Sequence, residues 1–332
     1  MSITAVVPVW NGRDLLARLL ASLAAQTTPA AEVLVVDNGS QDDAPELAFR
    51  LGARVIPMGR NAGFAAAVNR GIREARGEWI AVLNSDVELA PDYFEKLLAV
   101  RAPFATGKIL QAAQPQPGQA VIDATFDALC RGATAWRVGS GRADGPIFSQ
   151  ELAIASPPWT AVLIRADVFP RVGFLEETFE SYLEDVDFGM RCAALHIQGR
   201  YVPTALARHR GSATLGRWHP ETVRRIARNQ LLLLARHYSS RLILRWLWPI
   251  LVAQLLWGAV ALRHGTGFAW LRGKWQGLSA FADARGNGRR LDAEFLKKWL
   301  PENERRIHEI QQATGFDSYW RLYFFLTRGG TK

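Results

Sequence analysis

The first hundred residues alternate between short apolar runs and amphipathic stretches. The apolar runs have the length and composition of buried strands, and they lie at residues 3–9, 32–37, 53–58 and 78–84. The stretches between and after them repeat apolar residues at helical spacing, and they lie at residues 14–26, 64–75 and 91–100. Buried strands that alternate with helices predict an α/β fold, with a mostly parallel central sheet and helices on both faces.

Polar or conformationally restricted residues end each of these predicted strands, at 8–11, 37–38, 60–61 and 84–86. Open α/β sheets bind their ligands beyond the carboxyl ends of the strands, so we expect the functional site at this edge. Two more extended segments are predicted at 159–165 and 200–209, and the second ends in His209. Between 104 and 160 the alternation weakens, and the segments 111–120 and 137–145 predict loops over a site.

Three carboxylates, Glu184, Asp185 and Asp187, fall within four positions at the start of a predicted helix. One interpretation is electrostatic, because acids in a first turn face unpaired N–H groups and the positive end of the helix dipole. In that interpretation Asp187 forms a surface pair with Arg191, four residues further on. The other interpretation is chemical: carboxylates with a later histidine form a base and a divalent-metal site beside a diphosphate.

The last third of the chain differs in charge. Residues 1–200 carry a net charge of −5, whereas residues 201–332 carry +14 and eight of the 12 tryptophans. This contrast predicts two parts with separate roles, which we divide into residues 1–217 and 218–332. The second part is predicted to be helical, at residues 220–238, 241–263, 268–281 and 294–300.

An uncharged run of 17 residues, 246–262, lies within this second part. It is short for a membrane span, which takes about 20 apolar residues, and it contains Pro249. We interpret it as an interfacial helical region that meets an anionic membrane surface; a soluble helical subdomain, a dimer interface and a true span are the alternatives. The basic charge lacks a nucleic-acid reading motif, so no nucleic-acid partner is expected.

Several other classes of protein are disfavoured. No GxGxxG follows the first predicted strand and no GxxxxGK[ST] occurs, which argues against a dinucleotide site and excludes a P-loop. The chain starts with a predicted strand rather than a signal peptide. Cys130 and Cys192 lie in apolar settings, so we expect free buried thiols and a cytoplasmic protein.

Several of these motifs, in this order, resemble glycosyltransferase family 2. They are VVPVWNGRDLLARLLASL, VLVVDNGSQD, NAGFAAAVNRGI, WIAVLNSDV, YLEDVDFGMR and ARHRGSA, and they cover roughly residues 3–215. The pattern is most similar to the bacterial branch that contains rhamnosyltransferases of cell-wall and O-antigen assembly. The resemblance implies a GT-A fold, a nucleotide-sugar donor, a divalent metal (Mg²⁺ or Mn²⁺) and sugar transfer with inversion.

The resemblance also implies which residues bind the donor. Those expected at the nucleotide and its diphosphate are Pro8, Asn11, Asp37, Asn61, Gly63, Asn69, Asn84, Ser85 and Asp86. Arg210 and Arg217 are expected in a loop that closes over the diphosphate. Asn84 stands where the family's D-x-D motif has its first acid, which predicts a less tightly held metal.

The catalytic assignments follow from the same resemblance. Asp185 matches the family's catalytic base, and Glu184 beside it is expected to bind substrate hydroxyls. Asp86 and His209 are expected to hold the metal, and Trp159 is expected with Glu184 at the acceptor.

These residues imply an inverting glycosyltransferase that acts in cell-surface polysaccharide assembly. We expect dTDP-rhamnose or a UDP-sugar as donor and a lipid-linked saccharide as acceptor, with the protein peripheral on the inner face of the cytoplasmic membrane. A small glycoside or a protein is an alternative acceptor. A catalytically weak, nucleotide-sugar-binding scaffold subunit at the membrane is the alternative function. A nucleotidyltransferase is disfavoured because no Gly/Arg-rich triphosphate loop is present.

Overall fold

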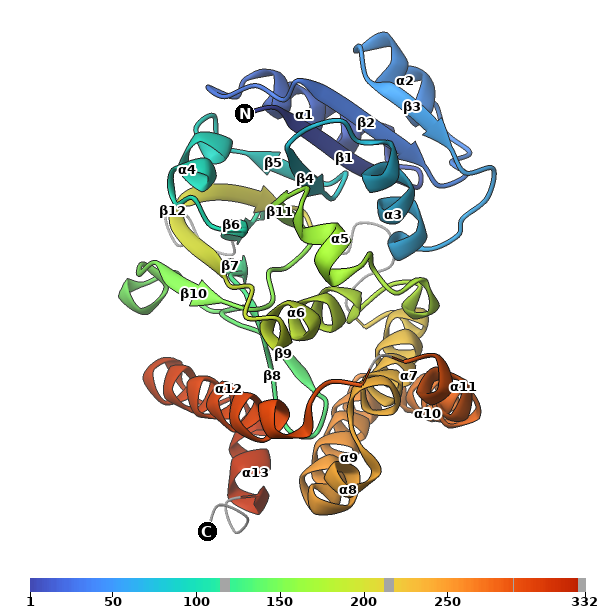
Figure 1. The fold of residues 1–332 in the computed structure, drawn as a ribbon, viewed down its shortest axis with the longest axis vertical. Helices are drawn as coiled ribbons and strands as arrows, with labels where there is room; N and C mark the ends of the chain where they lie inside the picture. Colours follow the sequence, from blue (N-terminus) through green and yellow to red (C-terminus); the bar gives the residue numbers. More distant parts are fainter. Residues whose placement is uncertain (114–119, 212–217, 289, 328–332) are drawn as a thin grey trace. The chain divides into compact units, whose positions relative to one another are not determined.

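The computed structural model describes residues 1–113, 120–211, 218–288 and 290–327 (Figure 1). The chain forms two compact units. Unit 1 comprises Met1–Asp127 and Arg137–Thr214, and unit 2 comprises Ala128–Trp136 and Leu215–Lys332. Division of the sequence at residue 217 would place residues 128–136 in the first part, whereas their contacts place them in unit 2.

Unit 1 is built on a large sheet, in which ten strands of the described chain take part. The main path runs β10-β12-β6-β11-β4-β1-β2-β3, with β5 paired to β12 and β7 paired to β6. The strands are β1 Ile3–Val9, β2 Glu32–Asp37, β3 Arg54–Pro57, β4 Trp79–Leu83, β5 Val87–Leu89, β6 Phe104–Gln111, β7 Ile122–Ala124, β10 Leu152–Ile154, β11 Ala161–Arg165 and β12 Gly199–His209. Strands β4, β1, β2 and β3 are parallel, which confirms the predicted fold class, and β11 is an antiparallel insertion between β4 and β6.

The helices of unit 1 cover both faces of the sheet. They are α1 Arg13–Ala24, α2 Ala44–Arg50, α3 Phe64–Glu74, α4 Tyr93–Ala99, α5 Val168–Val172 and α6 Glu184–Ala194. Helices α1, α2 and α4 share a buried core with the odd-numbered residues of β1. Gly71 of α3 lies on the other face, where a Cβ would come 2.3 Å from Val6 Cγ1. The alternating apolar pattern therefore produced the three-layer arrangement that the sequence predicted.

Strand β6 is the main element of the sheet that the hydrophobic pattern did not reveal. Its middle residues, Thr106, Gly107 and Lys108, interrupt the apolar run. All three are buried, because Thr106 Oγ1 donates to the Ala161 carbonyl and Lys108 Nζ lies 2.7 Å from Asp144 Oδ1. These partners are distant in sequence, so the local pattern carries no sign of them.

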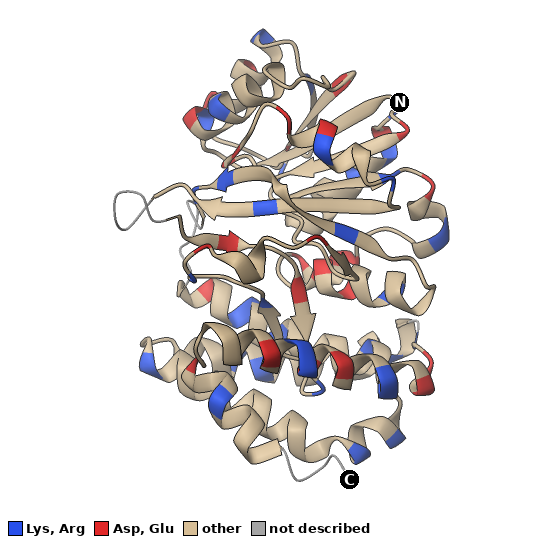
Figure 2. Cartoon of the chain, turned by 90° about the vertical axis from the view of Figure 1, so that its left-hand side faces the viewer, with Lys and Arg blue, Asp and Glu red and all other residues tan. Residues whose placement is uncertain are grey.

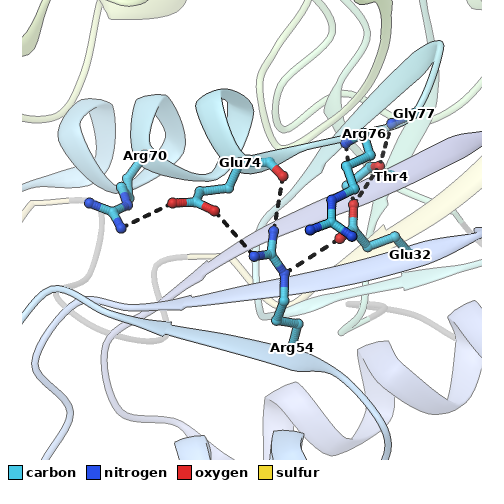
Figure 3. Close-up of polar contacts among 7 residues, drawn as sticks. All are labelled: Thr4, Glu32, Arg54, Arg70, Glu74, Arg76 and Gly77. Atoms are coloured by element: carbon cyan, nitrogen blue, oxygen red, sulfur yellow. Dashed lines mark hydrogen bonds and ion pairs between the residues drawn. The ribbon is translucent and has the colours of Figure 1, made fainter.

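The amino-terminal ends of the parallel strands are joined by a polar network (Figure 3). Arg54 of β3 forms ion pairs with Glu74 of α3 at 3.1 Å and with Glu32 of β2 at 3.4 Å. Glu32 also accepts a hydrogen bond from Thr4 of β1. The network fastens α3 to three strands at the edge of the sheet opposite the predicted site.

Unit 2 is helical apart from residues of the small β8–β9 sheet, formed by Asp127–Leu129 and Ala135–Arg137. Its helices are α7 Pro220–His237, α8 Ser240–Arg245, α9 Leu247–Arg263, α10 Gly267–Ser279, α11 Phe281–Asn287, α12 Ala293–Thr314 and α13 Ser318–Thr327. The helix predicted over 241–263 is two helices, because the chain turns at Trp246 and Pro249 is tolerated only in the first turn of α9. Helix α12 is longer than predicted and continues through Pro301.

Lys and Arg positions, blue in Figure 2, occur on several helices of unit 2. Along α12 they alternate with acidic residues, whereas α8, α9 and α10 contain no Asp or Glu. Among the described residues, no helix is long and apolar enough to cross a membrane. Both cysteines are buried free thiols, as predicted.

Candidate active site

The carboxyl ends of β1 and β2 place two predicted nucleotide-binding residues on neighbouring strands. Val9, which follows Pro8, lies opposite Asp37 in the parallel ladder. Asp37 Oδ1 accepts a 2.9 Å hydrogen bond from the N–H of Ser40, and Ser40 Oγ accepts one of 2.9 Å from the N–H of Asn11. The loops after the two strands are therefore joined, and they hold Asn11 and Asp37 at the same edge of the sheet.

A second set of bonds shapes the loop before α3. Asn38 Nδ2 donates to Asn61 Oδ1 at 3.1 Å and to the carbonyl of Gly63 at 3.2 Å. Asn61 Oδ1 also accepts from the N–H of Gly63. Gly63 has φ 90°, and a Cβ there would lie 2.9 Å from the carbonyl oxygen of Glu180. Only glycine fits this close approach, which brings the loop against the segment that leads into α6.

Asn69 of α3 also contacts the segment before α6. Its side chain is 1% exposed; Nδ2 donates to the carbonyl of Leu175 and to Glu177 Oε1, and Oδ1 accepts from the N–H of Leu175. These bonds use both polar atoms of Asn69 to hold the protein's own chain. Its expected contact with a nucleotide stays a prediction.

The backbone immediately before α6 is strained. Glu180, Tyr182 and Leu183 all have positive φ, at 60°, 73° and 69°. Left-handed backbone costs a residue other than glycine about 1–2 kcal/mol, and such conformations concentrate at functional sites. The strained segment directs the first turn of α6, which carries Glu184 and Asp185.

Asp185 is held by two hydrogen bonds at the start of α6. Its Oδ1 accepts from the N–H of Val186 at 2.8 Å, and its Oδ2 accepts from Arg137 Nη2 at 3.1 Å. Arg137 also points its Nε toward Asp127 Oδ1, at 3.4 Å. Asp185 is 6% exposed and Asp127 8% exposed, so a single guanidinium balances two buried carboxylates.

Burial and mutual repulsion change the ionisation of this cluster. Burial raises the pKa of Asp127 to about 7; the Arg137 charge opposes the rise and the Asp185 charge adds to it. Burial, and then the Asp185 charge, raise the pKa of Glu184 well above its ordinary value. Burial alone would lower the pKa of Arg137, but Asp127, Asp185 and Asp123 together raise it. Burial and the neighbouring Asp185 charge therefore both favour the protonated form of Glu184.

Three buried polar atoms around Asp185 lack a hydrogen-bond partner in the described chain: Glu184 Oε2, Asp127 Oδ2 and Trp159 Nε1. Trp159 is 2% exposed, and its ring meets Phe188 edge-on at 5.0 Å. An unpaired buried polar atom costs about 1–3 kcal/mol, which hydroxyls of a bound ligand would offset. These unpaired atoms make the surroundings of α6 a candidate for ligand contact.

His209, at the end of β12, lies between two carboxylates. Its Nε2 is 3.0 Å from Asp86 Oδ1, and its Nδ1 is 2.8 Å from Asp123 Oδ2. Burial lowers the pKa of His209, but hydrogen bonds to Asp123 and Asp86 outweigh it and raise the pKa to about 9. The structure therefore brings together the two predicted metal ligands and adds Asp123, which the sequence analysis did not single out.

The other residues predicted to bind the diphosphate lie beside Asp86 in the sequence or follow His209. Asn84 and Ser85 are half-buried, and the N–H of Asn84 donates to the Thr160 carbonyl. The N–H of Arg210 donates to the carbonyl of Asp86, while its side chain is 3.9 Å from Glu88. Arg217 lies outside the described residues.

Sequence comparisons agree with this arrangement. The family model "Glycosyl transferase family 2" matches residues 4–101. The N-acetylglucosaminyl-diphospho-decaprenol L-rhamnosyltransferase of Mycobacterium tuberculosis is 30% identical over 286 residues, which is 75% of this chain and 87% of the relative. The chain belongs to glycosyltransferase family 2. This family 2 glycosyltransferase is also similar to the putative glycosyltransferase EpsH of Bacillus subtilis, with 33% identity over 154 residues. That match covers 40% of this chain and 44% of the relative.

A solved structure supports the GT-A fold. The crystal structure of GalNAc-T7 with UDP, GalNAc and Mn²⁺ matches with a TM-score of 0.62 at 14% identity. The match covers 95% of this chain and 58% of that one. At this identity the likeness shows the fold alone.

Asp86 and His209 are the residues of this glycosyltransferase that are expected to hold a divalent cation. Asp86 presents a carboxylate next to a ring nitrogen of His209, and Asp123 on the other ring nitrogen is the arrangement that orients metal-binding histidines. Among the described residues, no group of three or more His, Cys, Asp or Glu is arranged to hold a metal ion. Mg²⁺ is commonly held by one or two carboxylates while substrate phosphates and water complete its shell, so two protein ligands are sufficient.

The sequence analysis missed Asp123, Asp127 and Arg137. The two acids stand four residues apart in the otherwise apolar run VIDATFDALC, and this was the only local signal for them. Arg137 lies in a segment predicted as a loop. Asp187 was expected in a surface pair with Arg191; the pair exists at 2.8 Å, but it is buried, since Asp187 is 0% exposed.

Proposed function

We propose that this glycosyltransferase transfers a sugar, with inversion, from a nucleotide-sugar to a hydroxyl of a lipid-linked saccharide in cell-surface polysaccharide assembly. The observation that carries the proposal is the buried carboxylate of Asp185, paired with Arg137 and surrounded by unpaired polar atoms. The name of the M. tuberculosis relative supports transfer of rhamnose to a diphospho-polyprenol saccharide. Our candidate donors are dTDP-rhamnose and a UDP-sugar.

In the proposed reaction, Asp185 is the general base. It accepts the proton of the acceptor hydroxyl as that oxygen bonds to the anomeric carbon, and the bond from this carbon to the diphosphate oxygen breaks on the opposite face. Glu184, whose pKa is raised by burial and by the Asp185 charge, binds a substrate hydroxyl. The indole N–H of Trp159 donates another to the acceptor. Arg137 orients Asp185 and balances its charge before the proton arrives.

The donor lies along the carboxyl edge of β1, β2 and β4 in this proposal. The residues assigned to it are Pro8, Asn11, Asp37, Asn61, Gly63, Asn69, Asn84, Ser85, Arg210 and Arg217. Mg²⁺ or Mn²⁺ held by Asp86 and His209 would offset the negative charge that develops on the leaving diphosphate. Residues 1–217 are then the catalytic domain, and residues 218–332 hold the protein peripherally on the inner face of the cytoplasmic membrane.

The replacement Asp185→Asn tests the chemistry. Because it keeps the shape of the side chain and removes its basicity, we expect transfer from dTDP-rhamnose or a UDP-sugar to fall by 10²-fold or more. Nucleotide binding should remain, measured as the thermal shift with UDP, GDP, dTDP or CMP, each with and without Mn²⁺. A ligand at 100 times its dissociation constant adds about 2.7 kcal/mol of stability, which is easily detected.

Asp14→Asn is the matched control, since Asp14 is an exposed acid in the first turn of α1. It should retain wild-type transfer. Transfer by Asp185→Asn at the wild-type rate would exclude this mechanism. A wild-type protein that binds one nucleotide without turnover on any acceptor would favour the scaffold alternative.

A further inference from the structure

Helix α9 of unit 2 carries a row of large apolar side chains that are exposed. Trp248, Leu251, Leu255 and Leu262 are 58%, 44%, 62% and 72% exposed. At 100° per residue they fall within about 60° of the helix circumference, so they form one stripe. Ala259 is also exposed in this sector, and no charged residue lies there. The stripe is therefore uninterrupted along most of the helix.

Helix α10 carries a second stripe of the same kind. Phe268, Leu271, Trp275 and Leu278 are 81%, 57%, 69% and 64% exposed. The side of α10 that packs on the protein is not the side that carries this stripe, because Gly273 and Gly277 lie against the backbone of α7. The two stripes meet at the turn between α9 and α10, where the Leu262 side chain lies against Gly267. We call these eight residues the apolar face.

The charged residues in the part of the chain that carries the apolar face are all positive. No Asp or Glu occurs between Glu221 and Asp283. The exposed arginines of this region are Arg241, Arg245, Arg263 and Arg272. A second copy of the same face would bring like charges together, whereas an anionic lipid surface would neutralise them.

The length of the helices and their apolar stripes also favour a lipid surface. No described helix is long and apolar enough to span a bilayer. A helix with an apolar stripe, tryptophans and flanking arginines instead lies in the plane of the interface, with its apolar side at the boundary between headgroups and acyl chains. Trp275 suits this depth because its ring is apolar and its N–H is polar. The N–H of Trp248 instead donates to the Leu326 carbonyl in α13, at 2.9 Å.

We propose that the apolar face docks unit 2 onto an anionic phospholipid bilayer. The large apolar side chains enter the headgroup–acyl boundary, and the four arginines contact lipid phosphates. The docking surface rests on the proposed function in one respect, because a lipid-linked acceptor makes the bilayer the place where this enzyme works. It identifies the side chains of the membrane contact, in the run 246–262 that the sequence indicated and in α10.

Sedimentation of the full-length protein with vesicles tests the proposal. One set of vesicles contains phosphatidylglycerol and phosphatidylcholine at 3:7, and the other contains phosphatidylcholine alone. We expect binding to the anionic vesicles that weakens at high salt. The double variant Leu255→Ser/Trp275→Ser should bind at least tenfold less tightly, because it removes an apolar side chain from each stripe. Arg263→Gln/Arg272→Gln should lose about fivefold per arginine.

Phe49→Ser/Leu51→Ser is the matched control, since both residues are exposed apolar side chains of unit 1, at 74% and 56%. It should bind vesicles like the wild type. Failure of the wild type to bind anionic vesicles would overturn the proposal. The proposal would also be overturned if Leu255→Ser/Trp275→Ser bound vesicles as tightly as the wild type and light scattering showed a dimer for the wild type but not for the variant. A second copy of the chain would then cover the apolar face.

A transfer assay separates this proposal from the proposed function. With a water-soluble, short-chain acceptor and no vesicles, Leu255→Ser/Trp275→Ser should transfer sugar at the wild-type rate while failing to bind vesicles. Vesicle binding without transfer to any acceptor would support the docking surface and contradict the enzymatic proposal. Loss of transfer to the short-chain acceptor in the double variant, with vesicle binding unchanged, would contradict the docking proposal.

Discussion

Arg137 is the residue on which the charge of the candidate active site depends. It donates to Asp185 Oδ2 at 3.1 Å and approaches Asp127 Oδ1 at 3.4 Å, and it lowers the pKa of Asp127 and of Glu184. Without it, three carboxyl groups would be buried with less positive charge among them. Removal of one partner from a buried charge pair costs several kcal/mol. A buried carboxylate that has lost its positive partner therefore takes up a proton.

The variant Arg137→Met should lower kcat about 10²-fold and leave KM for the nucleotide-sugar nearly unchanged. A transition of the pH profile of kcat/KM that Asp127 causes near its pKa of about 7 should move to higher pH, because the guanidinium that lowers this pKa is removed. Arg137→Lys should restore part of the activity, since it keeps the charge but only one of the two contacts. A wild-type pH profile in Arg137→Met would show that Arg137 does not act through these carboxylates.

At the scale of elements, a buried lysine joins three helices of unit 2. Lys274 of α10 donates to the Ala227 carbonyl at 2.9 Å and to Gln230 Oε1 at 2.8 Å, both in α7, and to Gln254 Oε1 in α9. Its partners are neutral oxygens, and burial lowers its pKa to about 7. The sequence shows only a lysine in an amphipathic helix, and nothing there indicates that it faces inward.

Lys274 should make the stability of unit 2 depend on pH. In the unfolded chain the lysine has an ordinary pKa near 10.5, so between pH 7 and pH 10 the unfolded state binds more protons and stability rises with pH. Lys274→Met lacks this gain. We expect the free energy of unfolding of the wild type to improve relative to the variant by about 2 to 4 kcal/mol from pH 6.5 to pH 9.5. Urea denaturation at both pH values measures it.

The exposed Lys298 of α12 provides the control for this experiment. Lys298→Met and the wild type should change in parallel over the same pH range. Parallel curves for Lys274→Met as well would mean that Lys274 keeps its proton in the folded protein.

At the scale of the whole molecule, the two units are not consecutive segments of the chain. Residues 128–136 leave unit 1, pack within unit 2 and return. Arg131 in this excursion is buried against Glu304 of α12 at 2.8 Å, and Gln254 of α9 donates to the carbonyl of Gly132. Trp136 contacts Trp320 of α13, with ring centroids 6.3 Å apart. Residues 128–136 therefore need unit 2 in order to be buried, although they lie within the first 217 residues.

A truncated chain of residues 1–217 should fail to form a stable monomer. The truncation exposes Leu129, Cys130 and Trp136, which are 8% exposed or less, and leaves Arg131 without Glu304. We expect aggregation in size-exclusion chromatography. The same truncation with residues 128–136 replaced by a Gly/Ser loop should recover monomer. A monomeric 1–217 chain with the full-length melting temperature would contradict this expectation.

The sequence by itself determined the alternation of strands and helices in the first hundred residues and the polar ends of the strands. It also revealed the acidic start of α6. These features follow from local spacing, because a strand buried on both faces or a helix buried on one must repeat apolar residues at its own period. The motifs at the strand ends were recognisable for the same reason, since each lies within a few consecutive residues.

Only the tertiary structure decided the rest. Strand β6 can bury Lys108 because Asp144, 36 residues away, compensates its charge. Asp185 is paired because Arg137, 48 residues before it, reaches α6. The uncharged run of α9 did not record which of its sides is buried, because packing against neighbouring helices decides that. Burial and charge balance depend on neighbours that are far apart in the chain, and a residue's own position along the chain does not record them.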